Sequence, residues 1–515
     1  MEQPSSTSSA AAEPPKEEPG PAEGEGRPEG AGAPDAAEAS VEHAGYQRQF
    51  ARTLSRFESF AVAFSFISIT TGLFTTYGTV LGYGGPAGIW TWPVVTIGTA
   101  LVALVYGMLA SRIPLSGYSY QWASRLASPL LGWWFGWVSF AFLAIVAVAV
   151  DYGLTQVALF PLFGIEYTAT AGAIGTAVVL LLQMTLIIWS TPIATRVNNL
   201  AVGAEVLAMT GLTLLIAGAC VFTDTGDWSN LASVGEAPAK GYFGFLGPFM
   251  LSALLGAFTL VGWESAANLA EETHDPKRVV PRAMVRAILL SGAIGMLFLI
   301  VITVGAGSKV PELTKSSAPV AAIIEQTLGH VAASVMLVVV SIAIFACGLV
   351  IMVSNSRLVH AMARDGRLPC SGVLSRVPRP TGGPTWATAT VAAASIAIVA
   401  AFGTNPDALP QLLSAGTLMP ALLYAGTVAL FIATRRKYTP RPDDFTLGKW
   451  EKPVVAGAVL WLVAELCIFG IPGDFRQAQL YALGTLVLGA LVFAGVWVRR
   501  REALTREPGV EVESL

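Results

Sequence analysis

Two apolar segments of the chain contain stretches rich in small and hydroxyl residues. The first reads Ser68-Ile69-Thr70-Thr71-Gly72, and the second reads Gly256-Ala257-Phe258-Thr259-Leu260-Val261-Gly262-Trp263-Glu264-Ser265. Gly, Ser and Thr inside an apolar helix lower its stability and supply donors and acceptors for freed backbone groups. Unwound backbone is tolerated in a bilayer only where protein buries it or a cavity borders it. Close packing of helices through small residues would explain either stretch alone.

The composition around these stretches is that of a membrane protein. Of the 515 residues, 54% are hydrophobic and 13% are charged, whereas about 25% are charged in soluble domains. A soluble core cannot absorb this much apolar sequence and still leave a polar surface. The four cysteines and four histidines fit no metal or redox motif. We therefore expect no metal, no cofactor and no nucleic-acid partner, and we expect a lipid bilayer around the protein.

From Phe57 onward, long apolar runs alternate with short polar loops. A membrane-spanning helix needs about 20 apolar residues, and on that criterion the sequence predicts twelve spans. They cover residues 57–82, 88–110, 130–160, 171–190, 198–222, 243–269, 284–307, 331–356, 384–402, 408–434, 453–471 and 477–498. The predicted organisation is a disordered tail at 1–45, rich in Ala, Pro, Glu, Gly and Ser, a membrane domain at 46–502 and a C-terminal tail at 503–515.

The distribution of basic residues predicts the orientation of these spans. If the N-terminus is cytoplasmic, 27 of the 31 Lys and Arg residues fall in the tails or in loops on the cytoplasmic side. Such an excess is typical of cytoplasmic loops. We therefore expect both termini to be cytoplasmic and the number of spans to be even.

The two polar stretches lie in the first and the sixth span, which cross the membrane in opposite directions. Equivalent broken helices occupy these positions when a protein consists of two inverted five-helix repeats. The predicted fold is therefore an all-α membrane protein with twelve transmembrane helices. It comprises a 5+5 inverted repeat, in which helices 1 and 6 are broken, and two further C-terminal helices.

Three carboxylates lie within the predicted spans. Glu264 is in the sixth, Glu205 is in the fifth, and Asp151 is near the outer end of the third. A carboxylate at mid-membrane costs at least about 2.5 kcal/mol on insertion scales, so Glu264 is a candidate partner for a cation or proton. Its alternative is a protonated structural glutamate. For Glu205 a structural role is equally open, and for Asp151 an interfacial or structural role is favoured.

Several stretches occur in an order and spacing that is similar to a known family. They are Ser68 to Phe74, Ile113-Pro114-Leu115-Ser116-Gly117-Tyr118-Ser119-Tyr120, Gly262 to Ala267 followed by Ala270-Glu271-Glu272-Thr273 and Val280-Pro281-Arg282-Ala283, and Ser356-Arg357 with Ala363-Arg364-Asp365-Gly366. Over residues 50–500 the chain resembles the amino acid–polyamine–organocation (APC) superfamily. Within it, the chain resembles the amino acid/choline transporter family, which includes GABA and choline permeases.

The resemblance implies the inverted-repeat fold of a bacterial leucine transporter, with substrate bound at the unwound parts of spans 1 and 6. The matching positions are Ser68, Ile69, Thr70, Thr71, Gly72, Phe258, Thr259, Gly262, Trp263 and Glu264. By analogy with that fold, Glu205 is the candidate for coupling to a proton or sodium ion. The basic clusters after spans 6 and 8 are expected to serve in cytoplasmic gating or, equally, in topology alone.

The resemblance implies a secondary active transporter that moves amino acids or related amine-bearing solutes, such as GABA, choline-like compounds or polyamines, across the plasma membrane. Neither polar stretch contains Lys or Arg, and Glu264 adds negative charge. The half-helix after Gly72 would favour a carboxylate at its N-terminus, whereas free carbonyls before each break favour an ammonium. An exchanger without ion coupling and a transport-inactive nutrient receptor remain alternatives. A membrane-embedded enzyme is disfavoured, because no catalytic carboxylate cluster, His-based metal motif or nucleophile elbow is present.

Overall fold

A computed structural model of the whole chain defines the fold. The structure describes residues 46, 50, 52–189, 191–223, 226–316, 318–378, 383–405, 407–437 and 441–509. The predicted tail at 1–45 lies outside the described residues, as do residues 510–515 of the predicted C-terminal tail. The last helix continues to Thr505.

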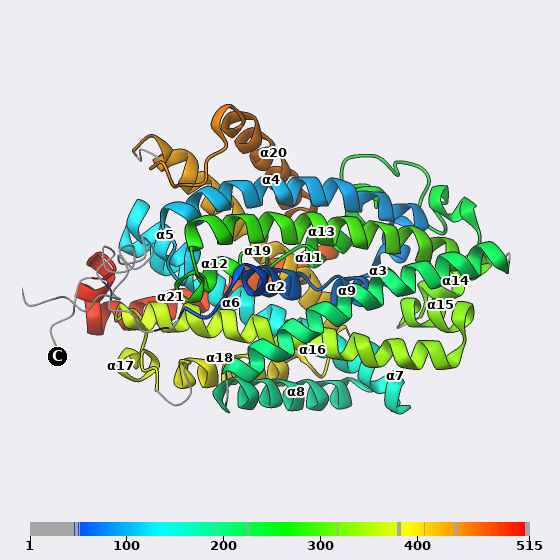
Figure 1. Cartoon of the computed structure of the whole chain (residues 1–515), viewed down its shortest axis with the longest axis horizontal. Helices are drawn as coiled ribbons and strands as arrows, with labels where there is room; N and C mark the ends of the chain where they lie inside the picture. Colours follow the sequence, from blue (N-terminus) through cyan, green and yellow to red (C-terminus); the bar gives the residue numbers. More distant parts are fainter. Residues whose placement is uncertain are drawn as a thin grey trace, which may run out of the picture.

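The described chain is built from helices, most of which run along the long axis of the molecule (Figure 1). Within the described ranges, eleven helical segments are long and apolar enough to cross a membrane. They are α2–α3 (Arg56–Ile67, Ile69–Gly84), η1–α4 (Pro86–Trp90, Thr91–Arg112), α6–η2–α7 (Pro129–Gly153, Leu154–Leu159, Phe160–Phe163), α8 (Ala169–Trp189), α9 (Thr191–Phe222), α13 (Pro276–Gly305), α16 (His330–Arg364), α18 (Thr385–Phe402), α19 (Ala408–Thr434), η7–α20 (Gly448–Trp450, Glu451–Gly470) and η8–α21 (Gly473–Phe475, Arg476–Thr505). The predicted all-helical membrane fold is confirmed.

The predicted sixth span is not among these segments, because it is divided into short helices. It consists of α10 (Pro248–Leu251), α11 (Leu254–Thr259), α12 (Ser265–Asn268) and the 3-10 turn η4 (Ala270–Glu272). The apolar run Pro248–Thr259 is too short to span a bilayer by itself. The first span is also interrupted, because Ser68 separates α2 from α3 with φ 34° and ψ 90°. The predicted breaks in spans 1 and 6 are therefore both present.

Some segments expected to be loops are helical. The segment before the third span forms α5 (Tyr118–Leu126), and the connection between α13 and α16 contains η5 (Gly307–Lys309), α14 (Val310–Thr314) and α15 (Pro319–Leu328). Short helices also occur at η3 (Trp228–Ala232), α17 (Ser371–Leu374) and η6 (Arg435–Lys437). Such short pieces carry no long hydrophobic period, so the sequence pattern does not distinguish them from loops.

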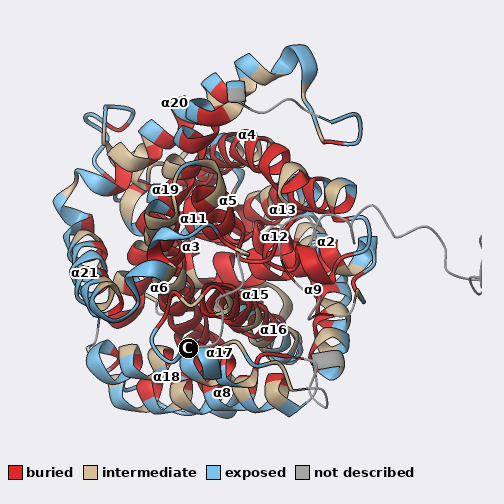
Figure 2. Cartoon of the chain, turned by 90° about the vertical axis from the view of Figure 1, so that its left-hand side faces the viewer, coloured by how far each residue is buried: buried red, intermediate tan, exposed pale blue. Residues whose placement is uncertain are grey.

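The broken helices lie at the centre of the bundle. In the apolar stretch of the first span, 83% of the residues are buried inside the protein, whereas in the last span only 11% are buried. Figure 2 shows buried residues gathered on α3, α11, α12 and α16, with exposed faces on α8, α18, α20 and α21 at the periphery. The exposed faces of the outer helices are apolar, as expected for helices that contact lipid.

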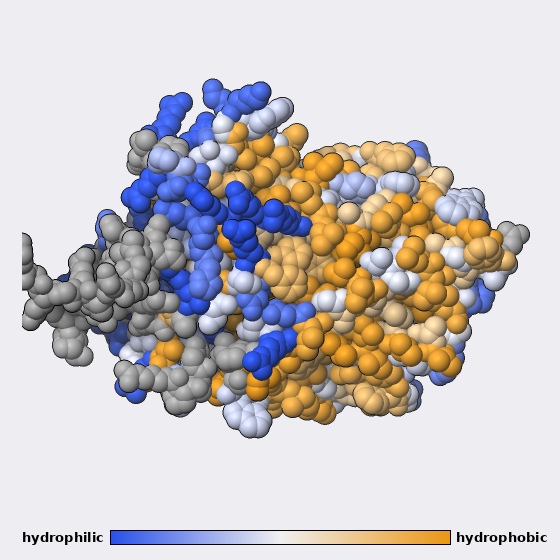
Figure 3. Space-filling model, in the orientation of Figure 1, coloured by the Kyte–Doolittle hydropathy of each residue, from blue (hydrophilic) through white to orange (hydrophobic). Residues whose placement is uncertain are grey.

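The two ends of the bundle differ in polarity (Figure 3). We call the end at which α13 begins and α16 finishes the basic end, since Arg278, Arg282, Arg357 and Arg364 lie there. In Figure 1 this end is on the left, with α5, α17 and the C-terminal part of α21, while α14 and α15 lie at the opposite end. The apolar band between the two ends is the part of the surface that a bilayer would cover.

Candidate functional site

The break in the first span is centred on Ser68. Its side chain accepts hydrogen bonds from the Thr71 N–H at 3.3 Å and from the Thr71 hydroxyl at 2.7 Å, which caps α3. Gly72 N–H donates to the Ser68 carbonyl at 3.0 Å, so Gly72 already belongs to the first turn of α3. The half-helix expected after Gly72 therefore begins four residues earlier. Ile69, which follows Ser68, is fully buried.

Glu205 of α9 occupies the N-terminus of α3. Its Oε1 accepts hydrogen bonds from the Ser68 hydroxyl and from the Thr70 N–H, both at 3.0 Å. The Glu205 residue is 2% exposed. Free N–H groups and the helix dipole favour a negative charge at such a position. The position at which the sequence predicts a solute carboxylate is therefore occupied by a carboxylate of the protein itself.

The break in the sixth span covers residues 260–264. Gly262 has φ +88°, a conformation that glycine adopts without steric cost. A Cβ at Gly262 would overlap the ring of Phe66, and a Cβ at Gly72 would overlap the side chain of Thr259. The two broken helices therefore pack against each other through these glycines.

Glu264 lies directly before α12, and it is 2% exposed. Its Oε2 accepts a hydrogen bond from the hydroxyl of Tyr424 in α19 at 2.8 Å. Its Oε1 is buried and has no hydrogen-bond partner among the described residues. The Tyr424 oxygen also accepts the Gly262 N–H at 3.4 Å. Glu264 thus has one oxygen held by the protein and one left for a further donor.

A cluster of aromatic rings adjoins this carboxylate through Tyr424, which contacts it, and Trp263, the preceding residue. The Trp263 ring centroid lies 4.9 Å from that of Tyr106 in α4 and 5.2 Å from that of Tyr424, and Tyr106 and Tyr424 are 5.5 Å apart. Trp122 of α5 extends the cluster at 5.4 Å from Tyr106. The Trp263 Nε1 is buried and has no hydrogen-bond partner in the described part of the chain. A carboxylate beside several aromatic faces is suited to a cation.

The predicted site residues fall into two groups. Ser68, Thr70 and Thr71 gather around Glu205, whereas Gly262, Trp263 and Glu264 gather around Tyr424 and Tyr106. Gly72 and Thr259 form the contact between the breaks. Phe258 is buried and faces Gly416 of α19, apart from the aromatic cluster.

Tyr106, Trp122 and Tyr424 are not among the site residues predicted from the sequence. Tyr106 and Tyr424 lie in ordinary apolar spans, where a lone tyrosine has no distinguishing pattern. Trp122 lies just after the Ile113–Tyr120 stretch, so this motif is the one sequence signal that points to the α5 segment and to Trp122.

Asp151 is buried within the bundle. It accepts a hydrogen bond from Gln183 Nε2 of α8 at 2.8 Å, and both side chains lie against Gly348 of α16. Its exposed fraction is 0%, so its side chain is enclosed by protein, and its interfacial or structural role stays a prediction. In the described ranges, no group of three or more His, Cys, Asp and Glu residues is placed to hold a metal ion.

Buried ion pairs close the bundle at the basic end. Arg357 Nε lies 2.8 Å from Glu272 Oε1, and Arg364 Nη2 lies 3.0 Å from Glu271 Oε1. The side chain of Arg357 is 0% exposed and that of Glu272 is 8% exposed. These pairs connect the end of α16 with the segment that follows α12. Arg357 and Arg364 therefore contribute to the packing of these segments.

The N-terminal segment is held over the same end. The hydroxyl of Tyr46 donates to Asp365 at 2.8 Å, and the hydroxyl of Tyr120 hydrogen-bonds the same carboxylate. Burial, and then the charge of Asp365, raise the pKa of Tyr46 above its ordinary value, which keeps its hydroxyl a donor. The Leu54 and Thr53 N–H groups donate to the Glu272 carbonyl. Several independent contacts therefore join the N-terminal segment, α5 and α16 to the segment that follows α12 at the basic end.

Comparison with known proteins agrees with this architecture. The chain is 28% identical over 469 residues to the amino-acid permease BAT1 of Arabidopsis thaliana, covering 85% of this chain and 89% of the relative. It is 26% identical to the branched-chain amino acid permease BcaP of Lactococcus lactis, covering 84% and 92%. It is also 26% identical to the thiamine transporter thi9 of Schizosaccharomyces pombe, covering 79% and 74%.

These relatives are named permeases and transporters and are not enzymes. The model of the amino acid permease family matches residues 54–493, which include both broken helices and the aromatic cluster. The chain therefore belongs to the amino acid permease family of the APC superfamily, and it is a multi-pass membrane protein that transports small solutes.

Proposed function

We propose that the protein is a secondary active transporter that moves amino acids or related amine-bearing solutes across the plasma membrane by alternating access. The observation that carries this proposal is the buried Oε1 of Glu264, which lacks a partner among the described residues and lies beside the rings of Trp263, Tyr106 and Tyr424. The names of BAT1 and BcaP support amino acids as the solute class. The name of thi9 supports a range that extends beyond amino acids.

The amine of the solute binds at the break in the sixth span. An ammonium group donates to Glu264 Oε1, while Tyr424 holds the other oxygen in place. The aromatic faces add cation–π attraction, which strengthens when water is excluded. A quaternary nitrogen of a choline-like solute can use the charge and the rings without donating a hydrogen bond. The residues proposed to border the solute are Ser68, Ile69, Thr70, Thr71, Gly72, Phe258, Thr259, Gly262, Trp263 and Glu264.

Glu205 links the solute to a cation gradient. It holds the N–H of Thr70, which a solute carboxylate would also seek. Two carboxylates cannot share one helix terminus unless a cation neutralises one of them. A proton or sodium ion bound at Glu205 allows the solute carboxylate to approach α3. When this cation leaves, the two carboxylates repel each other again. Ion and carboxylate-bearing solute therefore bind best together, which is the requirement for symport.

The basic end faces the cytoplasm in this proposal, because positive charge accumulates in cytoplasmic loops. Both termini then lie inside the cell. With the ion pairs Arg357–Glu272 and Arg364–Glu271 formed, the cytoplasmic path is closed. Release of solute to the cytoplasm requires these ion pairs to break. Separation of the pairs and hydration of their charged groups are therefore part of the alternating-access cycle.

Flux into proteoliposomes tests the proposal. Purified protein should accumulate a labelled amino acid when a proton or sodium gradient is imposed, and unlabelled zwitterions or cations such as GABA and choline should compete. Dicarboxylates and sugars should not compete. Flux that needs solute on both sides and ignores the gradient would indicate an exchanger. Binding without any flux would indicate a nutrient receptor and would contradict the proposal.

A further inference from the structure

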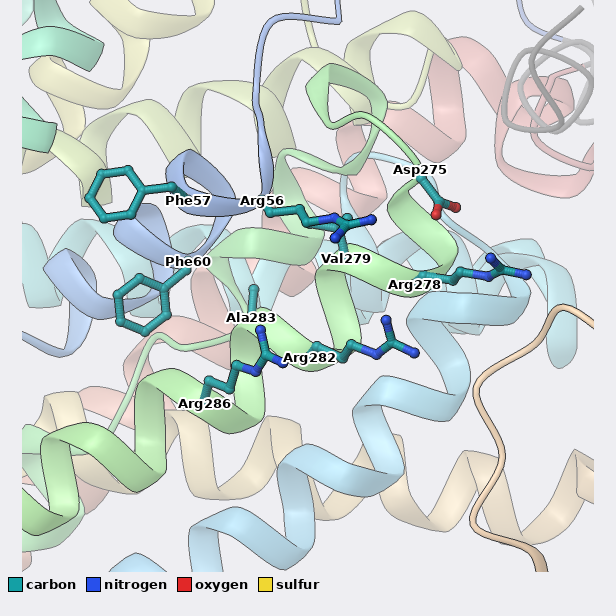
Figure 4. A pocket seen from close by; sticks show the side chains of 9 residues that line it. All are labelled: Arg56, Phe57, Phe60, Asp275, Arg278, Val279, Arg282, Ala283 and Arg286. Carbon is teal, nitrogen blue, oxygen red and sulfur yellow. The ribbon is translucent and has the colours of Figure 1, made fainter.

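A recess with an accessible volume of about 270 Å³ lies at the basic end, outside the site described above. Its walls come from the start of α2 and the first three turns of α13. Figure 4 shows arginine side chains that extend from both helices around it, with Phe57 and Phe60 together on one side. Its lining residues are Arg56, Phe57, Phe60, Asp275, Arg278, Val279, Arg282, Ala283 and Arg286. Four arginines and one aspartate therefore share one recess.

Little negative charge of the protein balances these arginines. Arg278 pairs with Asp443 at 3.1 Å, on the exposed surface. The nearby Glu58 is used to cap α2, where it accepts the Ser55 N–H at 2.7 Å. Among the described residues, the side chains of Arg56, Arg282 and Arg286 form no hydrogen bond or ion pair. An excess of Lys and Arg anywhere at this end is enough to determine the orientation of the spans. Orientation alone does not require three guanidinium groups to lie around one cavity.

The recess lies where a bilayer surface would meet the protein. α13 has 30 residues, so it is about 45 Å long and exceeds the hydrocarbon thickness of about 30 Å. Its first turns, which carry Arg278 and Arg282, project toward the headgroups. Arg286 lies one turn deeper, and the exposed Leu289 and Leu290 follow it toward the bilayer interior. Phe57 of α2, which lines the recess, is 55% exposed. Along α13, from the basic end toward the bilayer interior, the arginines are thus followed by an apolar surface.

We propose that this recess, between the start of α2 and the first turns of α13, is a binding site for the phosphate of an anionic phospholipid. Arginine forks bind phosphate oxygens in a bidentate manner. Basic pockets between membrane helices suit anionic headgroups for the same reason. The acyl chains of the lipid lie against Phe57, Leu289 and Leu290, whereas a soluble phosphate ion would leave these side chains exposed. The bound phosphodiester bridges Arg56 of α2 to Arg282 and Arg286 of α13.

Lipid retention by the full chain tests this site. Native mass spectrometry of detergent-purified protein would be titrated with phosphatidylglycerol and, separately, with phosphatidylcholine. The variant Arg282→Gln/Arg286→Gln removes two charges from the recess. The control Arg499→Gln/Arg500→Gln removes two exposed arginines from α21 at the same end. We expect phosphatidylglycerol affinity to fall at least tenfold in the recess variant, with no change in the control. Phosphatidylcholine affinity should be low and equal in all three proteins.

Two further measurements separate this site from its alternatives. Arg282→Lys/Arg286→Lys should retain more phosphatidylglycerol than the Gln variant, and all variants should melt at the wild-type temperature without lipid, since the changed side chains are exposed. Equal phosphatidylglycerol affinity in the recess and control variants would overturn the proposal. Displacement of the lipid by equimolar inorganic phosphate would overturn the assignment to a lipid. Neither readout depends on transport, so failure here leaves the proposed function untouched.

Discussion

Glu205 and Glu264 are two buried carboxylates with different surroundings. Glu205 accepts the Ser68 hydroxyl and the Thr70 N–H through a single oxygen. Glu264 accepts one tyrosine hydroxyl and keeps its other oxygen without a partner among the described residues. Because N–H and O–H donors stabilise a carboxylate, Glu205 is the better-solvated ion and Glu264 the stronger acceptor for an incoming cation. The proposed division of roles, ion coupling by Glu205 and amine binding by Glu264, is based on this difference.

Replacement of Glu205 tests whether this residue couples solute movement to an ion gradient, as proposed. In Glu205→Gln, the amide can still accept the Thr70 N–H but no longer carries the charge that attracts a cation. Accumulation driven by an ion gradient should fall about tenfold or more, because a membrane carboxylate that binds and releases a cation is lost. Counterflow of labelled against unlabelled solute, measured in the same proteoliposomes, should decline far less. Equal loss in both assays would mark Glu205 as a structural residue.

At the scale of elements, the two broken helices contact each other through Gly72 and Gly262. Gly72→Leu would push a side chain into Thr259, and Gly262→Leu would meet Phe66 in a backbone conformation with φ +88°. The left-handed conformation alone costs about 1–2 kcal/mol for a non-glycine residue. Both variants should lose most uptake per molecule of folded protein in the membrane. Gly211→Leu in α9, where open space surrounds the glycine, is the control and should transport normally.

The geometry allows a rescue of a smaller substitution at Gly72. The three atoms that crowd Gly72 are Oγ1, Cγ2 and Cβ of Thr259, so Thr259→Gly, which removes all three, should restore part of the uptake lost in Gly72→Ala. Normal uptake by both leucine variants would contradict the position of the site at the breaks. Loss of uptake in Gly211→Leu to the same degree would show that any bulky residue in these helices is harmful.

The connection between α12 and α16 also depends on a buried ion pair. Glu272→Gln leaves the fully buried Arg357 without a compensating charge, and removal of one partner of such a pair costs about 3–5 kcal/mol. We expect a clear decrease in the melting temperature of the detergent-solubilised protein. Glu502→Gln removes an exposed pair with Arg506, which is worth about 0–1 kcal/mol, and should melt like the wild type. Indistinguishable melting of the two variants would contradict the buried pair.

The elements differ in how far the sequence predicts them. Long apolar runs identify the spans, and Gly262 marks the second break because its φ requires glycine. The first break lies at Ser68, not at the more obvious Gly72, because a contact from Glu205 in a distant helix stabilises Ser68 in a conformation that serine rarely adopts. Tyr106 and Tyr424 join the site only through tertiary packing. Contacts between residues more than a hundred positions apart carry no local pattern, so these two tyrosines could not be predicted from the sequence.

At the scale of the whole molecule, the orientation rests on the charge difference between the ends. Cys370 is exposed at the basic end, and Ala239 is exposed in the loop before α10. With the other three cysteines replaced, an impermeant maleimide applied to intact cells should label Ala239→Cys and leave Cys370 unlabelled. Permeabilised cells serve as the control, in which both positions react. Labelling of Cys370 alone in intact cells would mean that the basic end faces outward.

The whole protein is proposed to select solutes by their amine, and Glu264 is the residue on which this selection depends. Loss of a charge-assisted hydrogen bond costs about 1–3 kcal/mol, which corresponds to a loss of affinity of roughly 5- to 150-fold. The matched control is Glu465→Gln, which alters another buried glutamate in the peripheral helix α20.

The decisive measurement is the affinity of purified wild-type, Glu264→Gln and Glu465→Gln protein for one labelled amino acid in a scintillation proximity assay. We expect Glu264→Gln to bind at least about fivefold more weakly, the lower limit of the range above, while Glu465→Gln binds like the wild type. Unchanged affinity in Glu264→Gln would contradict the proposal that Glu264 binds the amine of the solute.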